Sequence, residues 1–283
     1  MEGFYYHNKD SIFIFRKYSL DKILLVNESL DQNHLIKTGN NGMANHTSRT
    51  RNPIVYREGK LYALVIPYLD FSKKEIFNAK VDLEFVIDLQ TQENYFLAVD
   101  YPEKYQGNSW GISHSIPCRI VTDDGQILYS FGITQDMFVH NIASSRFYQK
   151  ESKLYTDYEI NPMNIVDPIG NQNLEYFIET DFFSEIFYDK YNDVYYRILK
   201  RGIPLENAQG ELEMWENKPA TIIVLDKNFN QIGEHNLEPP IDYYVRDMFV
   251  GKDGFYISNV HPNNLNIVED SIKFTLFKLK RNE

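Results

Sequence analysis

The chain contains a single cysteine, Cys118, and this scarcity limits the chemistry open to it. One thiol cannot form an internal disulfide framework or a zinc site built from several cysteines. Because Cys118 follows a proline and begins an apolar segment, we expect a small buried side chain rather than a nucleophile.

Long apolar runs are also absent. No stretch approaches the roughly 20 residues that a membrane-spanning helix needs. The opening MEGFYYHNKDSIFIF lacks the basic start and apolar segment of a secretory signal. These features predict no transmembrane segment and a cytoplasmic location, unless a leader and further mature sequence precede Met1.

Clusters of basic residues are lacking as well. The chain has 29 Lys and Arg against 40 Asp and Glu, which gives a formal net charge of -11. Binding to a phosphate backbone requires clustered Lys and Arg, so we expect no nucleic-acid partner. The acidic balance favours solubility and repels anionic lipid.

Signatures of common catalytic and metal sites are missing too. There is no G-x-S-x-G elbow, and no S-x-x-K is accompanied by its supporting motifs. The segment 226–230 opens like a calcium loop, but Gln231 stands where that loop needs glycine. Four histidines are isolated, without the spacing of a metal site: His114, His140, His235 and His261. We therefore expect no catalytic residue, metal or cofactor.

Aromatic and hydrophobic residues, in contrast, are abundant. Aromatic residues make up 15% of the sequence, with 21 Tyr and 19 Phe, and hydrophobic residues make up 43%. Tyr and Phe favour the half-buried surface of a pleated sheet. A chain of 283 residues can bury a sizeable core, either in one large all-β domain or in two ordinary ones.

A β-hairpin stands out within residues 174–199. The apolar arm 186–188 runs into the polar turn 189–192, and a second β-favouring arm follows at 194–198. Similar hairpins have their turns near residues 59, 152 and 253, and the opening stretch resembles them. A second kind, with Asp or Asn at the turn, lies at 83–99, 119–131 and 222–234.

Alternating hairpins with a unit of roughly 40–60 residues predict a β-propeller of five to six four-stranded antiparallel blades. We expect one domain over 1–283, with strands from both ends in its last blade and N-terminal strands missing as one option. The hairpin at 119–131 is interpreted as a degenerate blade. Loop insertions are expected near 27–52, 100–117 and 202–218. The competing all-β arrangement, two stacked sandwiches, needs no repeat.

Several stretches carry a family resemblance. They are FIETDFFSEIFYDKYNDVYYRILKRGIP, with YDKYNDVYYR at 188–197 as the most specific piece, then KPATIIVLDKNFNQIGEHNL, DMFVGKDGFYISN and EDSIKFTLFKL. They resemble the uncharacterised family called domain of unknown function 4221, found mainly in bacteria of the Bacteroides group, over nearly the whole chain. The resemblance implies a six-bladed fold and a lipoprotein-like location in the periplasm or at the cell surface. It implies no catalytic residues, because none are known for the family.

Two tryptophans are candidates for recognition. Trp110 lies in the polar loop 106–111 and Trp215 in the acidic insertion. A large apolar ring on a loop is a better recognition candidate than one in a strand, where aromatic residues first of all form the core.

A ring of polar residues is predicted at one mouth of the channel. If the first arm of each first-kind hairpin is the innermost strand of its blade, the residues entering these arms lie around one opening. They are Arg51, Asn52, Arg146, Glu185, Arg246 and Asp247. Arginine binds carboxylates and phosphates bidentately, so we expect a pocket for an anionic or carbohydrate-like group. The alternative is that the charged members only pair with one another.

Three functional interpretations follow. The first is a non-catalytic binding or scaffold propeller of the bacterial cell envelope, monomeric, that recognises a glycan, a peptide or a protein. The second is a hydrolase or lyase that acts on a carbohydrate or ester in the channel, which would require facing carboxylates or a metal. The third is a structural or sensory partner of an envelope complex.

Overall fold

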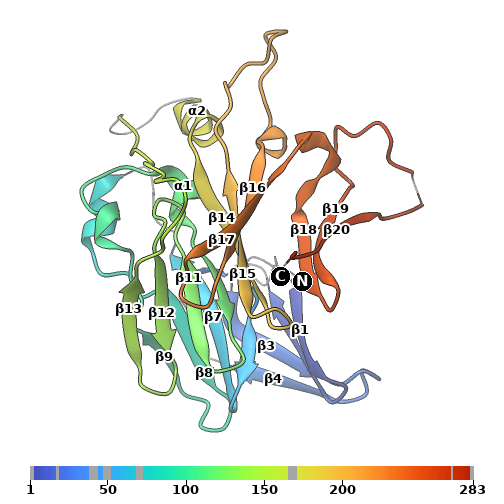
Figure 1. Cartoon of the computed structure of the whole chain (residues 1–283). Helices are drawn as coiled ribbons and strands as arrows, with labels where there is room; N and C mark the ends of the chain where they lie inside the picture. Colours follow the sequence, from blue (N-terminus) through green and yellow to red (C-terminus); the bar gives the residue numbers. More distant parts are fainter. Residues whose placement is uncertain are drawn as a thin grey trace.

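Antiparallel sheets follow one another along the chain and stand side by side around a common axis (Figure 1). The computed structural model describes residues 3–16, 19–37, 44–46, 52–67, 73–164, 171–268 and 270–280. It contains five sheets, which confirms the predicted all-β propeller with the lower of the two expected blade numbers. The six blades implied by the family resemblance are not reached in the described part of the chain, because its strands supply five sheets.

Sheets 1 and 2 are built from the first third of the chain. Sheet 1 contains β1 (Gly3–Asn8), β2 (Ser11–Arg16), β3 (Ser19–Val26) and β4 (Asn33–Lys37). In sheet 2, β5 (Ala44–His46) and β6 (Val55–Arg57) both pair with β7 (Lys60–Pro67), followed by β8 (Glu84–Asp88) and β9 (Asn94–Leu97). Since β4 and β5 fall within 27–52, the prediction of a plain loop there is wrong.

Sheets 3 to 5 complete the ring. Sheet 3 contains β10 (Cys118–Val121), β11 (Gln126–Ser130), β12 (Met137–Asn141) and β13 (Arg146–Lys150). Sheet 4 contains β14 (Phe182–Asp189), β15 (Val194–Lys200), β16 (Ala220–Leu225) and β17 (Gln231–Leu237). Sheet 5 has three described strands, β18 (Tyr244–Gly251), β19 (Gly254–Ser258) and β20 (Phe274–Phe277).

Three predictions about strand pairing are wrong. The hairpin 119–131 is no degenerate blade, because β12 and β13 extend it to a full four-stranded sheet. The segment 146–158 is no hairpin, because β13 pairs with β12 and no strand forms within 151–158. In the described part of the chain, sheet 5 contains only C-terminal strands, and β1 belongs to sheet 1, where it pairs with β2.

Helices are short and lie in the connections. They are η1 (Lys74–Asn78), η2 (Glu103–Tyr105), α1 (Gly111–Ser115), α2 (Gln172–Glu179), η3 (Trp215–Asn217) and η4 (Pro240–Asp242). The expected insertions at 100–117 and 202–218 thus carry η2 with α1 and η3, respectively. Among the described residues, no helix has the length and apolar character to cross a membrane.

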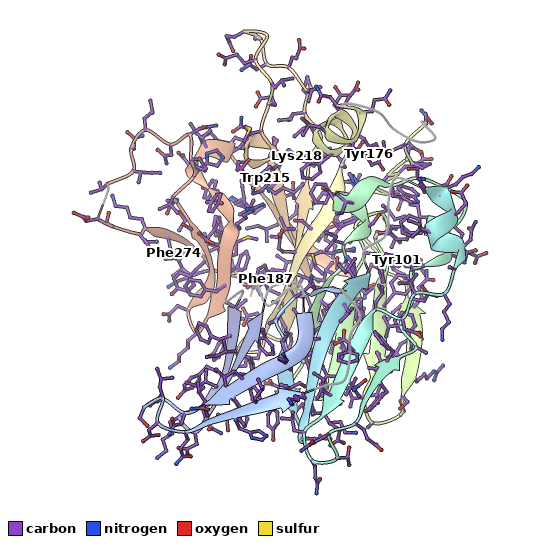
Figure 2. All side chains as sticks on the ribbon, turned by 180° about the vertical axis from the view of Figure 1, so that it is seen from behind. Tyr101, Tyr176, Phe187, Trp215, Lys218 and Phe274 are labelled. Carbon is purple, nitrogen blue, oxygen red and sulfur yellow. The ribbon has the colours of Figure 1, made fainter. Side chains whose placement is uncertain are left out.

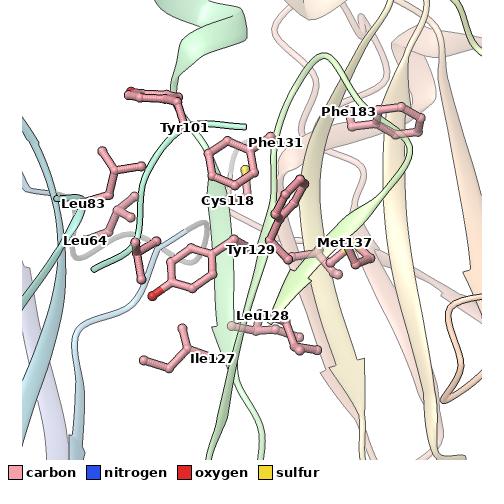
Figure 3. Packing of buried hydrophobic residues seen from close by; sticks show 14 of the residues in the cluster. Leu64, Leu83, Tyr101, Cys118, Ile127, Leu128, Tyr129, Phe131, Met137 and Phe183 are labelled. Carbon is pink, nitrogen blue, oxygen red and sulfur yellow. The ribbon is translucent and has the colours of Figure 1, made fainter. Parts of the chain in front are cut away.

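The core consists of apolar layers between neighbouring sheets, one of which is drawn in Figure 3. Strand β15 shows how they form, because every residue of it is buried. Tyr195 and Leu199 pack into the layer shared with sheets 2 and 3, whereas Tyr196 and Ile198 pack into the layer shared with sheet 5. Side chains that alternate along a strand therefore cover both faces of the sheet.

The first strands of sheets 3 to 5 lie nearest the axis. β14 contacts β10 on one side and β18 on the other. Chain order in each sheet then runs outward, to β13 and β17 as the outermost strands of sheets 3 and 4. Polar residues on β14 and β18 can therefore meet, whereas residues on β13 lie away from them.

Candidate functional site

A cavity of about 200 Å³ opens between β14 and β18, next to α1, α2 and η3. We call it the cationic pocket. Its polar lining consists of Ser113, Ser184, Glu185, Lys200 and Arg246, with Trp215 at the same wall. Figure 2 shows Trp215 and Lys218 at the end of the molecule that carries α2.

Backbone irregularities bring two of these side chains into the pocket. The pairing of β14 with β15 shifts register between Phe183 and Ile186, and Glu185 lies in this stretch. The pairing of β18 with β19 shifts between Tyr244 and Met248, around Arg246. A β-bulge bends its strand and changes the direction of a side chain, and bulges occur frequently beside functional sites.

Two cations flank the indole ring of Trp215. The Arg246 guanidinium lies 3.9 Å from the ring centroid and the Lys200 ammonium 6.0 Å from it. Both attract the negative face of the ring. Lys200 is buried, whereas Arg246 is exposed. With Glu185 as the carboxylate of the lining, the charged lining groups of the pocket carry a net positive charge.

A third cation, Lys218, lies behind the pocket wall. Its ammonium donates hydrogen bonds to the carbonyl oxygens of Phe177, Ile178 and Thr180, at 2.6, 2.9 and 2.8 Å. These carbonyls lie at the C-terminal end of α2, where a cation is favoured by the helix dipole. Burial lowers the pKa of Lys218 to about 7, and nearby Asp181 opposes this shift. Lys218 thus fixes the end of α2 and with it Phe177, which lines the pocket.

His114 of α1 lies under the same wall and is completely buried. Its ring centroid is 4.5 Å from that of Tyr176 and 5.0 Å from that of Phe182. Burial, together with the positive charge of Lys218, lowers the pKa of His114 to about 3. The imidazole is therefore neutral at neutral pH, and the region next to the pocket gains no further charge from it.

Acidification should destabilise the fold through His114. Its pKa is about 3 in the folded chain against an ordinary value of 6.5, so between these pH values the unfolded chain takes up a proton that the folded chain does not. Stability is therefore lost as the pH falls through this range, by about 2 kcal/mol between pH 7 and pH 5. Urea denaturation of the wild type and of His114→Phe should show this extra loss in the wild type alone. Equal losses of stability in both proteins would refute the lowered pKa of His114.

Three of the predicted recognition residues meet in the pocket: Glu185, Arg246 and Trp215. Asp247 is exposed on β18 and does not line the pocket. Arg51 lies outside the described residues. Of the six residues predicted to ring the channel mouth, the structure thus brings together Glu185 and Arg246, from neighbouring strands of sheets 4 and 5.

Arg146 and Asn52, also predicted for the channel mouth, lie elsewhere. Arg146 is exposed on β13, away from the axis, and its guanidinium lies 5.3 Å from the Tyr148 ring. It was misplaced because β13 is the fourth strand of its sheet. Asn52 is buried and joins two sheets, since its Nδ2 donates to the Pro117 carbonyl and its Oδ1 accepts from the Arg119 amide. Its role there is structural.

Trp110 is not a surface recognition residue. Its side chain is 1% exposed, and its indole N–H donates to the carbonyl oxygen of Tyr105 at 3.2 Å. The loop that carries it is covered because η2 and α1 fold over the apolar core. The polar composition of this loop did not reveal that burial.

Lys200 and Lys218 were not recognised in the sequence. A lysine directly after the run 195–199, which is apolar apart from Arg197, is a weak signal. Within the described residues, no group of three or more His, Cys, Asp or Glu side chains is placed to hold a metal ion. A single carboxylate, Glu185, is found in the described lining, whereas glycoside hydrolysis ordinarily uses two.

Comparison with known proteins supports the fold. A crystal structure of a DUF4221 family member from Bacteroides vulgatus is similar over 97% of this chain and 76% of its own, with a TM-score of 0.76 and 20% sequence identity. A GH43 protein from Bacillus licheniformis is similar over 94% of this chain and 49% of its own, but the TM-score is 0.37 and the identity 12%. A comparison with the curated proteins gives no match.

A family model gives the assignment. The model of domain of unknown function 4221 matches residues 1–236, which is most of the sequence. This agrees with the resemblance of the segment 177–204, which contains β14 and β15. The chain therefore belongs to the DUF4221 family.

Proposed function

We propose that the protein is a non-catalytic binding propeller that holds a carboxylate group of its ligand in the cationic pocket. The observation that carries this proposal is the convergence of Lys200, Arg246 and Trp215 around a cavity of about 200 Å³. Arginine presents a planar fork of donors that matches a carboxylate, and lysine adds a compact charge.

The size of the pocket limits what enters it. Whole-ligand sites commonly measure about 300–1,000 Å³, and the cationic pocket is smaller. It therefore takes one charged group, while the rest of the ligand lies outside along the exposed part of β18. Ser113 offers a hydroxyl group beside the cations, whereas the Ser184 hydroxyl already donates to the Ile198 carbonyl at 3.3 Å. The Glu185 carboxylate disfavours ligand groups with a higher negative charge.

The source of the carboxylate is an acidic sugar or the end of a peptide. We extend the proposal to a location in the periplasm or at the cell surface, where both occur. Fractionation of cells that express the natural gene, followed by immunoblotting, tests this location. Recovery with the cytoplasmic markers would refute it.

Replacing Arg246 by alanine should weaken binding of D-glucuronate at least about tenfold, because a charge-assisted hydrogen bond to the carboxylate is lost. Arg246→Lys should retain part of the affinity, since charge remains but the fork is lost. Isothermal titration with D-glucuronate, D-glucose and N-acetyl-alanine measures the effect and separates sugar from peptide as the source.

Arg146→Ala is the matched control, because Arg146 is also an exposed arginine on a strand but lies outside the pocket. It should bind D-glucuronate like the wild type. Equal affinity of the wild type for D-glucuronate and D-glucose, or equal losses in the two alanine variants, would refute the proposal.

A further inference from the structure

A second cavity lies at the other end of the β14–β15 hairpin. Ser184 and Lys200, at the open end of this hairpin, line the cationic pocket, whereas Tyr188 and Tyr195, next to its turn, line a groove of about 420 Å³. The groove runs between sheets 3 and 4, and the turns β10–β11 and β16–β17 also contribute to it. We call it the turn groove.

Aromatic rings form one side of the turn groove. Ring centroids of Tyr188 and Tyr195 are 5.1 Å apart, and those of Tyr195 and Phe229 are 5.2 Å apart. Tyr195 and Phe229 are buried and support the others, whereas Tyr188 and, from sheet 3, Tyr148 are half-buried and keep part of their rings accessible. The groove therefore offers a partly exposed aromatic surface on a rigid base.

Both hydrogen-bond donors and acceptors surround these rings. Asp124 accepts a hydrogen bond from Gln126 Nε2 at 2.7 Å and another from the Thr122 hydroxyl. Across the groove, Asp193 accepts from the Tyr188 hydroxyl at 3.1 Å. Lys150, whose ammonium lies 5.0 Å from the Phe229 ring centroid, supplies positive charge to the lining.

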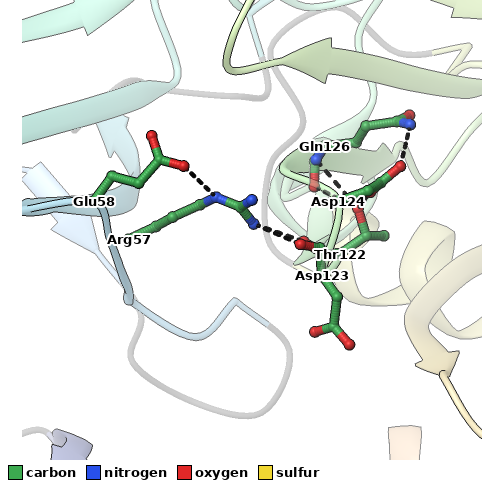
Figure 4. A network of polar contacts seen from close by, with 6 residues as sticks. All are labelled: Arg57, Glu58, Thr122, Asp123, Asp124 and Gln126. Carbon is green, nitrogen blue, oxygen red and sulfur yellow. Dashed lines mark hydrogen bonds and ion pairs between the residues drawn. The ribbon is translucent and has the colours of Figure 1, made fainter.

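The turn that carries Asp124 is held in place from sheet 2. Arg57 Nη1 donates to the carbonyl oxygens of Thr122 and Asp123, both at 3.1 Å (Figure 4). Gly125 has a φ of +84°, and a Cβ there would lie 2.9 Å from Arg57 Nη2. Glycine thus permits both the turn and the approach of the arginine. The polar rim is therefore pre-organised before any ligand arrives.

We propose that the turn groove binds an uncharged oligosaccharide, with a sugar ring stacked on Tyr188. The C–H groups of a sugar ring suit the negative face of an aromatic ring, and its hydroxyl groups need donors and acceptors together. The lining carries three aspartates and two lysines, Asp123, Asp124, Asp193, Lys150 and Lys227, so it suits neither a strongly anionic nor a strongly cationic ligand. The volume lies within the usual range of about 300–1,000 Å³ for ligand sites.

This site is independent of the cationic pocket. Isothermal titration of the full chain with maltotriose, cellotriose, xylotriose and mannotriose tests it, and trigalacturonate serves as the charged comparison. At least one neutral trisaccharide should bind, and Tyr188→Ala should weaken that binding at least about tenfold, because the stacking surface is lost. The cationic pocket is assayed with D-glucuronate, so each proposal can fail while the other stands.

Tyr191→Ala is the matched control, because Tyr191 is 53% exposed in the same turn and does not line the groove. It should bind like the wild type. Gln126→Ala, on the rim, should weaken binding to a smaller extent and provides a test that leaves the aromatic side unchanged. The proposal is overturned if no neutral trisaccharide binds the wild type, or if folded Tyr188→Ala and Gln126→Ala both bind like Tyr191→Ala. It is also overturned if trigalacturonate binds more tightly than the neutral trisaccharides to Arg246→Ala, in which the cationic pocket is impaired.

Discussion

Replacing Arg197 by alanine is expected to reduce the free energy of unfolding by roughly 3–5 kcal/mol, because buried acceptors lose their donor and a cavity forms. Arg197 belongs to β15 and is 0% exposed. Its Nε donates to Ser130 Oγ at 2.9 Å and its Nη2 to the Thr134 carbonyl at 2.7 Å. Its Nη1 donates to the Gln135 carbonyl. One side chain of sheet 4 thus provides hydrogen-bond donors for buried acceptors at the end of β11 and in the β11–β12 connection of sheet 3.

Urea denaturation followed by intrinsic fluorescence measures this loss. Arg146→Ala is a suitable control, since Arg146 is exposed on β13 and should change stability by no more than about 0.5 kcal/mol. Arg197→Lys should be intermediate, because lysine keeps the charge but lacks the planar fork. A loss below about 1 kcal/mol for Arg197→Ala would contradict the role of Arg197 as a clamp between sheets.

The second large effect is expected at Glu84 and Arg119, which form an ion pair between sheets 2 and 3. Arg119 Nε lies 3.0 Å from Glu84 Oε2, and both side chains are 0% exposed. The Tyr129 hydroxyl donates to the same carboxylate oxygen at 3.0 Å, and Arg119 Nη2 donates to the Tyr62 carbonyl. Burial raises the pKa of Glu84, while Arg119 opposes this shift and favours the charged form.

Glu84→Gln and Arg119→Met should each destabilise the fold by roughly 3–5 kcal/mol, because each leaves an uncompensated partner in a buried site. The double variant should lose clearly less than the sum, since no charge then remains unpaired. A double-mutant cycle of urea denaturation measures the coupling energy. Additive losses would show that the two groups do not depend on each other.

Arg197 and the Glu84–Arg119 ion pair show why the partners of a buried charge cannot be predicted from the sequence. An arginine inside an apolar strand, as in the run 194–199, shows that a charge is buried but not which group receives it. The partners of Arg197 lie in the segment 130–135, more than sixty residues away. Only the docking of sheet 4 against sheet 3 brings them together.

The propeller itself could be predicted because several of its strands, such as β8, β11, β15 and β16, are buried on both faces. Such strands read as apolar and aromatic runs between polar turns, and the run 186–198 contains two of them with their turn. The prediction of strands was incomplete for sheet 3, where β12 and β13 have five residues each. The segment 151–158 resembles a strand in composition but runs as an irregular connection.

The candidate site could be predicted only in part. The residues that enter the first arms of the hairpins were predicted to lie around one opening. For Glu185 and Arg246 the structure indeed shows a shared cavity. The same prediction misplaced Arg146, because it started from a wrong pairing. It also did not include the register shifts in the pairing of β14 with β15 and of β18 with β19, which the structure shows around Glu185 and Arg246.

The most direct test of the cationic pocket is a crystal structure of the protein soaked with D-glucuronate. We expect density for the sugar with its carboxylate oxygens within hydrogen-bond distance of Arg246 and Lys200, next to Trp215. Density at another place, or a sugar whose carboxylate points away from both cations, would contradict the proposed binding function.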